Sequence, residues 1–376
     1  MLGFKKFVGS NAIFPVPALS FLFFPHYLRN STRRYTDTKK LSLAEYNERI
    51  RELGFVGKYT LAFEQLQNMQ DQGLKPNKDT YGQLIFIGAK MKNTQLIGKY
   101  FQECKQNAEP DLLVYSKTML GYIRCGKPKQ AVQIFEELKQ TKIEINLIAY
   151  NTALNAHQKL GNLNEIEKLI AEMKEKGIEA DLYTYNIILN SHSSKPNVCD
   201  LTFDSLKKMK ERSIEPNEVT YNTLINNFSK GKRPDYVEHF YNEMIAKQIK
   251  PSTTTFNTMI IGFGSNKQIK KMLEVYQTMK TENVKLDAIT YTHLLAGLAE
   301  CKRDNVLPIF EAIMNEMKEN GFTIYSRVYE YYRDILFAAG NPVLAYQIEK
   351  KIKESEAKQS TKEVENKIDF NLLRKS

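Results

Sequence analysis

The chain has 376 residues, with 54 Lys and Arg against 43 Asp and Glu, and its formal net charge is +11. Hydrophobic residues make up 42% and aromatic residues 11%, so the chain can bury a core and is not of the disordered class. Four cysteines without a C-x-x-C pair exclude a disulfide scaffold and leave no framework for structural zinc. The positive charge fits a polyanion-binding protein, but it equally fits one that is merely soluble.

The first 35 residues are basic and contain no acidic residue. Such a segment is typical of an organelle transit peptide. The apolar stretch at 13–24 is too short to span a bilayer and is interrupted by Pro15 and Pro17. A secretory signal peptide also begins with charge and an apolar run, but the later Arg33 and Arg34 and the missing small-x-small site disfavour it. We expect 1–35 to be a mitochondrial transit peptide, cut after Tyr35, and 36–42 to be a linker in a matrix protein.

An aromatic residue then recurs nine times at intervals of 34 to 38 residues. These column aromatics are Tyr46, Tyr81, Tyr115, Tyr150, Tyr185, Tyr221, Phe256, Tyr291 and Tyr329. A second column keeps the same register and consists of Met69, Cys104, Leu138, Met173, Met209, Met244, Met279 and Met317. Gly and Pro residues recur after the second column, and both end helices. Each unit therefore predicts two short helices joined by tight turns.

The unit 218–252 illustrates the pattern. Apolar residues recur at helical spacing over 219–228 and again over 237–245, and Ser229–Pro234 breaks the pattern between them. One such hairpin has apolar faces that it cannot bury alone, whereas stacked hairpins can. The sequence therefore predicts an all-α fold, a right-handed α-solenoid superhelix with a concave groove.

The repeats resemble the pentatricopeptide repeat family in its plain 35-residue form. The segments VTYNTLINNFSKGKRPDYVEHFYNEMIAKQIKPS and IAYNTALNAHQKLGNLNEIEKLIAEMKEKGIEAD carry the resemblance. A tetratricopeptide array has a similar period, but its signature needs a Trp, and this chain has none. The resemblance covers nine units at 43–77, 78–111, 112–146, 147–181, 182–217, 218–252, 253–287, 288–325 and 326–358. The charged tail at 359–376 is expected to be disordered.

The resemblance implies binding of single-stranded RNA, one base per repeat. In the family, the base is read by the residue after the column aromatic and by the last residue of the repeat. The pairs here are Asn47 with Asn77, Ser116 with Asn146, Asn151 with Asp181, Asn186 with Asn217, Asn222 with Ser252, and Asn257 with Asp287. The family's preferences give the reading 5′-C-?-A-U-C-C-U-3′, in which the unknown base falls on the Gly82 and Asp111 repeat. The competing interpretation is that Asn, Asp and Ser are ordinary helix caps.

Two further sets of residues complete the predicted interface. Residues two before the column aromatic should flank the bases with nonpolar surface; they are Leu113, Ile148, Tyr183, Val219, Thr254 and Ile289. Cations nine residues after the aromatic could follow the phosphates; they are Lys90, Arg124, Lys159 and Lys230. Cations also suit helix C-termini without any RNA, so both interpretations stay open. Asp79, Arg327, Thr292, Tyr325 and Glu330 depart from the family's pattern in the second, eighth and ninth repeats.

We expect no enzymatic activity, no metal and no cofactor. None of the histidines is followed by Glu two residues on, as a zinc deaminase requires, and Gly262-Phe263-Gly264 lacks the Lys-Ser/Thr of a phosphate loop. The predicted function is that of a monomeric mitochondrial single-stranded RNA-binding protein in RNA stability, processing or translation. Alternatives are a structural subunit of a ribonucleoprotein such as the mitochondrial ribosome, in contact with ribosomal or RNA-processing proteins, and a protein-binding scaffold of the tetratricopeptide kind. Without the five cations of 1–35 the net charge falls to about +6, which is a modest excess. The prediction of RNA binding therefore depends on the residues that recur at the repeat period and less on the total charge.

Overall fold

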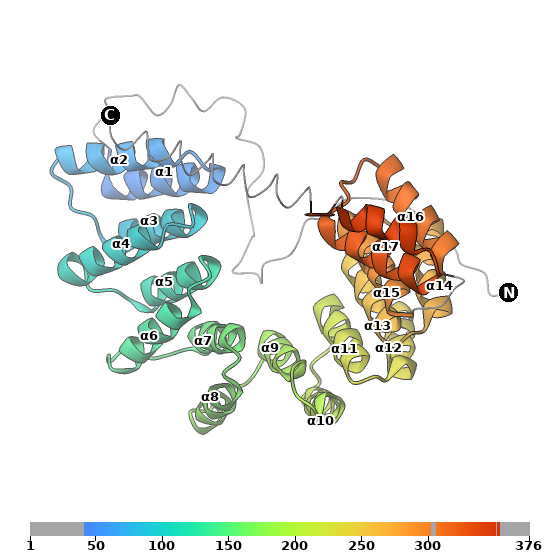
Figure 1. Ribbon diagram of the computed structural model, residues 1–376. Helices are drawn as coiled ribbons and strands as arrows, with labels where there is room; N and C mark the ends of the chain where they lie inside the picture. The colour runs from blue at the N-terminus through green and yellow to red at the C-terminus, as the bar shows by residue number, and fades with distance from the viewer. Residues whose placement is uncertain (1–40, 302–305, 351, 354–376) are drawn as a thin grey trace, which may run out of the picture. The chain divides into compact units, whose positions relative to one another are not determined.

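The computed structural model describes residues 41–301, 306–350 and 352–353 (Figure 1). Every regular element in these residues is helical. The predicted transit peptide at 1–35, most of the linker at 36–42 and the tail at 359–376 lie outside the described residues. The all-α fold predicted from the period is therefore confirmed for the part of the chain that the structure describes.

The chain divides into two compact units between Tyr183 and Thr184. The first unit holds α1 (Leu43–Val56), α2 (Tyr59–Asp71), α3 (Lys78–Lys90), α4 (Thr94–Asn107), α5 (Leu112–Arg124), α6 (Pro128–Lys139), α7 (Leu147–Leu160) and α8 (Leu163–Glu175). The second unit holds most of α9 (Leu182–His192), then α10 (Val198–Glu211), α11 (Glu218–Lys230), α12 (Pro234–Ala246), α13 (Thr253–Ser265), α14 (Ile269–Thr281), α15 (Ala288–Cys301), α16 (Leu307–Glu319) and α17 (Ser326–Ala338). Further helical residues lie at 342–350 and 352–353.

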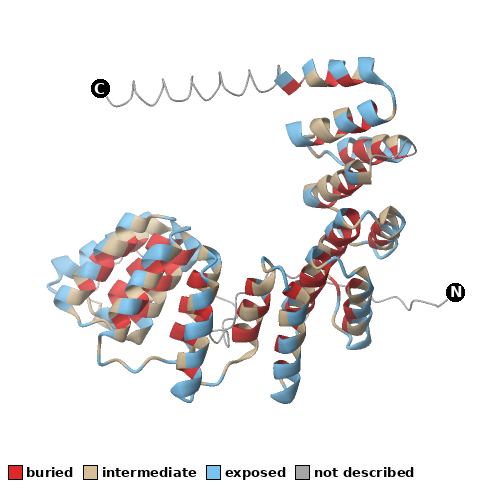
Figure 2. Ribbon diagram, turned by 60° about the horizontal axis from the view of Figure 1, so that its bottom comes forward, coloured by how far each residue is buried: buried red, intermediate tan, exposed pale blue. Residues whose placement is uncertain are grey.

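Within each unit the helices pack as serial hairpins. In the first unit α3 packs against its partner α4 and against α1 and α5, the first helices of the neighbouring hairpins. In the second unit α13 contacts α14, α11 and α15 in the same way. Figure 2 shows the buried residues on the helix faces turned toward neighbouring helices. The first helices thus form one layer and the second helices another, as an α-solenoid requires.

The column aromatics set the register of the core. Each is the fourth residue of the first helix of its hairpin, and all except Tyr329 are buried. The Met column is also buried, because it lies on the apolar face of the second helix. In the ninth hairpin Val328 and Tyr332 are buried instead, so this hairpin departs from the common packing.

Polar contacts join the two helices of a hairpin and also link neighbouring hairpins. The hydroxyls of Tyr115, Tyr150, Tyr221 and Tyr291 donate to Glu137, Glu172, Glu243 and Glu316 in the second helices, at 2.7 to 3.1 Å. Lys139 of the preceding hairpin reaches Glu172 at 3.2 Å. Burial alone would raise the pKa of Glu172, but hydrogen bonds from Lys176, Tyr150 and Lys139 outweigh it and hold that pKa below its usual value. The carboxylate therefore stays ionised where the hairpins meet.

Gly264 and Gly297 allow α13 and α15 to approach closely. A Cβ on Gly264 would lie 3.0 Å from the Cα of Gly297 and 3.1 Å from the Sδ of Met272. The Gly262-Phe263-Gly264 segment therefore serves packing between helices. The sequence alone does not reveal that Gly297 contacts Gly264, because Gly297 belongs to the next repeat.

Gly264→Ala is expected to destabilise the chain by about 1–3 kcal/mol, because backbone atoms must move to admit the methyl group. Helix propensity alone predicts the opposite sign, a gain of roughly 0.5–1 kcal/mol. Urea unfolding of the purified chain, with Ser265→Ala in the exposed neighbouring position as control, measures the difference. An unchanged or increased stability of Gly264→Ala would contradict the close approach.

Candidate nucleic-acid interface

Four of the predicted base-reading pairs are joined by direct hydrogen bonds. The Nδ2 atom of the first residue donates to the Oδ1 atom of the second in Asn47–Asn77 (3.1 Å), Asn151–Asp181 (3.1 Å), Asn186–Asn217 (3.4 Å) and Asn257–Asp287 (3.4 Å). The first residue is the fifth of its helix, and the second immediately precedes the first helix of the next hairpin. Stacking of successive first helices thus brings together residues 30 or 31 positions apart.

The second residue of a pair also caps a helix. Asn77 Oδ1 accepts from the backbone N–H of Thr80 at 3.0 Å, and Asn217 and Asp287 accept from Thr220 and Thr290 in the same way. This satisfies one of the donors left unpaired at a helix N-terminus. The capping interpretation is therefore correct for these residues, and the same side chains also meet the predicted base reader of the preceding repeat.

A buried threonine links the cap to the first residue of the pair, and the sequence analysis missed it. Thr80 Oγ1 accepts from the backbone N–H of Asn77 at 3.2 Å and donates to Asn47 Oδ1 at 2.6 Å. Thr220 repeats both contacts in the second unit. The full column, at the position before the aromatic, is Thr80, Thr184, Thr220, Thr255 and Thr290, each with no exposed surface. Its recurrence at the repeat period was the signal that could have identified it.

The remaining two pairs are not joined in this way among the described residues. Asn146 caps α7 by accepting from Ala149 N–H at 3.2 Å, but no bond links it to Ser116. Asn222 Oδ1 is buried without a hydrogen-bond partner in the described part of the chain, and Ser252 forms a capping box with Thr255 at the start of α13. Unpaired buried polar atoms are costly, and a ligand that supplied partners would remove that cost.

Most of the predicted base-flanking residues are exposed although they are apolar. Leu113, Ile148, Val219 and Ile289 are 44 to 56% exposed, and Thr254 is exposed as well, whereas Tyr183 is half-buried and accepts from Asn155 at 3.2 Å. Each lies two residues before a column aromatic, in the first turn of its helix. Isolated exposed apolar residues are ordinary, but a row of them beside polar pairs offers surface to the face of a base.

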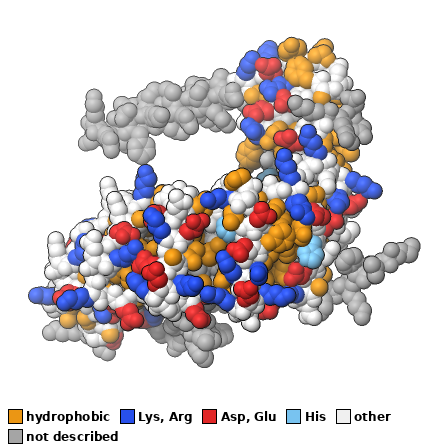
Figure 3. Space-filling view, turned by 90° about the horizontal axis from the view of Figure 1, so that it is seen from below, with side chains coloured by type: hydrophobic (Ala, Val, Ile, Leu, Met, Phe, Trp, Pro, Cys, Tyr) orange, Lys and Arg blue, Asp and Glu red, His pale blue; other side chains and the backbone are white. Residues whose placement is uncertain are grey.

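The four predicted phosphate-binding cations lie in the last turn of their helices and are exposed. Lys90 lies over the rings of Phe55 and Phe86, at 5.8 and 5.6 Å. None of the four forms an ion pair with a carboxylate of the described residues. On the face shown in Figure 3, cationic and anionic side chains are interspersed.

The outer repeats differ from the others. Thr292 Oγ1 donates to the carbonyl of Ala288, and Tyr325 is 57% exposed. Arg327 pairs with Glu330 and Tyr331 on the surface of α17. These contacts occupy the positions that would read and flank a base, so the structure brings no base-reading pair together in the eighth and ninth repeats.

The residues that the structure describes contain no group of three His, Cys, Asp or Glu side chains that could hold a metal ion. His157 is buried, and burial lowers its pKa, so it is held neutral in the core. None of the described helices combines the length and apolar character that crossing a bilayer requires.

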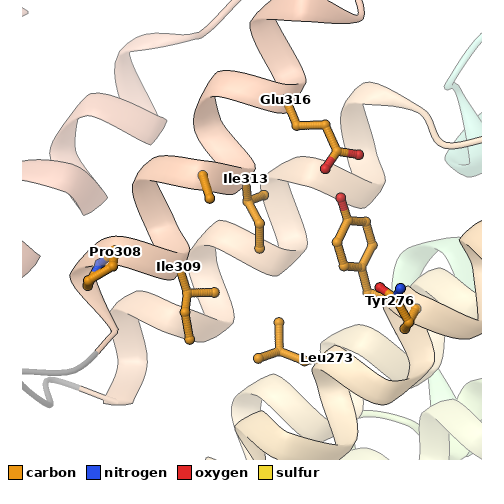
Figure 4. Close-up of a pocket in the computed structure, with 8 residues that line it drawn as sticks. Leu273, Tyr276, Pro308, Ile309, Ile313 and Glu316 are labelled. Carbon is orange, nitrogen blue, oxygen red and sulfur yellow. The ribbon is translucent and has the colours of Figure 1, made fainter.

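A cavity lies between the second helices α14 and α16. Figure 4 shows Leu273, Ile309 and Ile313 around it, with the hydroxyl of Tyr276 pointing toward Glu316. The predicted RNA-contacting residues, in contrast, lie in first helices or directly before them. The cavity therefore does not belong to the row of base-reading pairs.

Serial two-helix hairpins, several of them with a polar pair at the N-terminal end of the first helix, define a tandem helical-repeat protein. The sequence matches the family model of the pentacotripeptide-repeat region of PRORP over residues 149–320, and that of the pentatricopeptide repeat domain over 37–91 and 99–157. The chain belongs to the pentatricopeptide repeat family, which confirms the resemblance drawn from its repeats.

The solved structures of PPR10 share this fold. The pentatricopeptide repeat protein PPR10 in complex with an 18-nucleotide psaJ RNA element has a TM-score of 0.72 and 21% identity, and the match covers 85% of this chain and 46% of PPR10. PPR10 from maize gives a TM-score of 0.64 at 22% identity, over 85% of this chain and 44% of that one. This chain therefore spans less than half the length of PPR10. The PPR domain of Arabidopsis thaliana PRORP1, in complex with tRNA, matches 48% of this chain and 94% of its own length at 20% identity and a TM-score of 0.41.

Proposed function

We propose that the protein binds single-stranded RNA along the row of polar pairs at its first-helix N-termini, one base per repeat. The observation that carries the proposal is the recurring hydrogen-bonded pair, such as Asn151 with Asp181, with an exposed apolar residue, here Ile148, three positions before Asn151 in the same helix. The family and the RNA complex of PPR10 support it. The protein acts by occupancy, without catalysis: bound RNA is kept from folding and is shielded from nucleases.

The capping contacts explain how each pair could select a base. In Asn217 and Asp287, Oδ1 accepts from the following Thr and from the first residue of the pair. The second polar atom, Nδ2 of Asn217 or Oδ2 of Asp287, takes no part in these contacts. An amide N–H donates to a ring nitrogen acceptor such as N3 of cytosine, whereas a carboxylate accepts from a ring N–H such as N3–H of uracil. The last residue thus distinguishes the two pyrimidines.

The direct test is a binding measurement with the RNA 5′-C-N-A-U-C-C-U-3′, in which N is any base, against scrambled RNAs of the same composition. Fluorescence anisotropy at fixed ionic strength gives the two dissociation constants. We expect the specific RNA to bind at least tenfold more tightly, since several bases are read. Equal affinity for both RNAs would exclude base reading in this register.

The exposed cations give a separate prediction about the phosphates. Lys159→Gln should make the slope of log K against log salt less negative by about 0.7, because one fewer counterion is released. It should leave the preference between bases unchanged, since Lys159 lies at the far end of α7 from Asn151. A salt titration with Lys129→Gln, an exposed lysine of α6 outside the predicted column, is the matched control. An unchanged slope in Lys159→Gln would mean that this lysine does not contact a phosphate and only stabilises the C-terminus of α7.

The site of action that we propose is the mitochondrial matrix, in the stability, processing or translation of a transcript. The basic segment 1–35 motivates this proposal. Imaging of the full chain fused to a fluorescent protein, compared with a chain that starts at residue 36, tests it. Retention of mitochondrial localisation by the shortened chain would contradict it.

A second candidate is a structural subunit of a ribonucleoprotein such as the mitochondrial ribosome. The last hairpin favours it, because Phe337, Val343 and Tyr346 are 41 to 70% exposed and could contact a protein. Sedimentation separates the two functions. Stable migration with ribosomal subunits favours the structural subunit, and recovery of one protected RNA segment after crosslinking favours transcript binding.

A further inference from the structure

The second repeat lacks the first side chain of its pair, and a lysine from the next hairpin occupies the vacant place. A Cβ added to Gly82 would lie 3.2 Å from the Nζ atom of Lys117 and 3.5 Å from its Cδ. Lys117 belongs to α5, which packs directly against the α3 helix of Gly82. The equivalent positions in the neighbouring hairpins are Gln83 and Thr152, so the lysine is particular to this site.

The Lys117 ammonium is half-buried but is not neutralised by a close contact. Burial lowers the pKa of Lys117, while the charges of Asp79 and Asp111 raise it and that of Arg51 lowers it. No carboxylate of the described residues lies within ion-pair distance of its Nζ. An ammonium held in this way lacks partners for its donors, and a ligand that supplied acceptors would satisfy them.

Asp111 supplies the acceptor at the same place. Its Oδ1 atom accepts from the Val114 N–H at 3.1 Å, and its Oδ2 atom pairs with Lys78 at 2.9 Å. Burial would raise the pKa of Asp111, but the hydrogen bond from Lys78 and the backbone outweigh it, so the carboxylate stays ionised. Each carboxylate oxygen has two lone pairs, so both can accept a further hydrogen bond.

We propose that the second repeat selects guanine, with Lys117 in place of the side chain missing at Gly82. The Lys117 ammonium donates to O6 of guanine, and the Asp111 carboxylate accepts from N1–H and N2–H. Guanine alone among the four bases offers two adjacent N–H donors beside a carbonyl acceptor. The inference rests on the proposed RNA binding and assigns the base that the repeat pattern leaves open.

The test measures affinity of the full chain for four RNAs, 5′-C-N-A-U-C-C-U-3′ with each base at N. We expect the guanine RNA to bind about tenfold more tightly than the other three. Inosine at N lacks the N2 amino group and should lose part of this preference. Lys117→Met keeps the aliphatic stem without the ammonium and should bring the four affinities within about twofold of one another. Lys129→Met removes the same charge from α6 and should preserve the preference for guanine.

Gly82→Asn provides a gain of function that does not depend on removing a charge. The three atoms nearest to a Cβ at Gly82 all belong to the flexible side chain of Lys117, which can move aside. The new side chain creates an Asn–Asp pair like Asn151 with Asp181, and the preferred base should change from guanine to uracil. Equal affinity of the wild-type chain for all four RNAs overturns the proposal, as does a uniform loss of affinity in Lys117→Met, which would make Lys117 a phosphate contact. Failure of the proposed RNA binding can be told apart from failure of the guanine assignment. In the first case the chain would also lose discrimination between bases at the fourth to seventh positions of the RNA.

Discussion

Asp287→Asn is expected to change the base preferred by the seventh repeat from uracil to cytosine. The exchange keeps Oδ1, and with it the contacts to Thr290 and Asn257, and replaces only the outward Oδ2 acceptor by an Nδ2 donor. Discrimination of one base by such a contact amounts to about 1–3 kcal/mol, or roughly 5- to 150-fold in affinity. Both Asp and Asn are good helix caps, so the stability of α15 should hardly change.

The reciprocal variant Asn217→Asp serves as the matched experiment in the fifth repeat. Asn217 has the same three contacts on Oδ1, from Thr220 N–H, Thr220 Oγ1 and Asn186 Nδ2. Its preferred base should change from cytosine to uracil, which is the opposite sign. Dissociation constants for RNAs that differ only at the fifth or the seventh position measure both changes. If either variant lowers affinity for every RNA alike, the pair supports the helix and does not read a base.

The sequence predicted the fold because the fold is periodic. The spacing of the column aromatics determined where each first helix lies, and every one from Tyr46 to Tyr329 is the fourth residue of its helix. The Met column located the second helices in the same way. Nearest-neighbour stacking then needed no further information, since first helices such as α3 and α13 contact the first helices of the two adjacent hairpins.

The sequence could not predict which side chains of neighbouring repeats come into contact. Lys117 lies beside Gly82, one repeat earlier, and only the packing of α5 on α3 brings them together. Gly264 and Gly297 likewise belong to different repeats. The threonine column was periodic, but threonine at the third position of a helix is also a common capping residue. The hydrogen bond from the threonine hydroxyl to Asn47 or Asn186 of the preceding repeat could be seen only in the structure.

Thr220→Val is expected to weaken both the fold and the base preference of the fifth repeat. The variant keeps the shape of a fully buried side chain and removes its hydroxyl. The backbone N–H of Asn217 then loses its acceptor at 3.2 Å, and Asn186 Oδ1 loses its donor at 2.8 Å. Leaving such groups unsatisfied costs about 1–3 kcal/mol. Without the bond that orients it, Asn186 can rotate, and discrimination between bases at the fifth position should fall.

Urea unfolding and RNA binding together test this link between capping and recognition. The matched control is Val114→Thr, because valine naturally occupies the equivalent buried position before Tyr115. Asp111 caps α5 through the Val114 N–H in the same way as Asn217 caps α11 through the Thr220 N–H, so the control changes only the presence of the hydroxyl. If the Thr220→Val chain unfolds at a lower urea concentration but keeps full discrimination between bases, the role of Thr220 is limited to capping the helix. Loss of discrimination at the fifth position alone, with the others unchanged, would establish that the buried hydroxyl positions the base-reading asparagine.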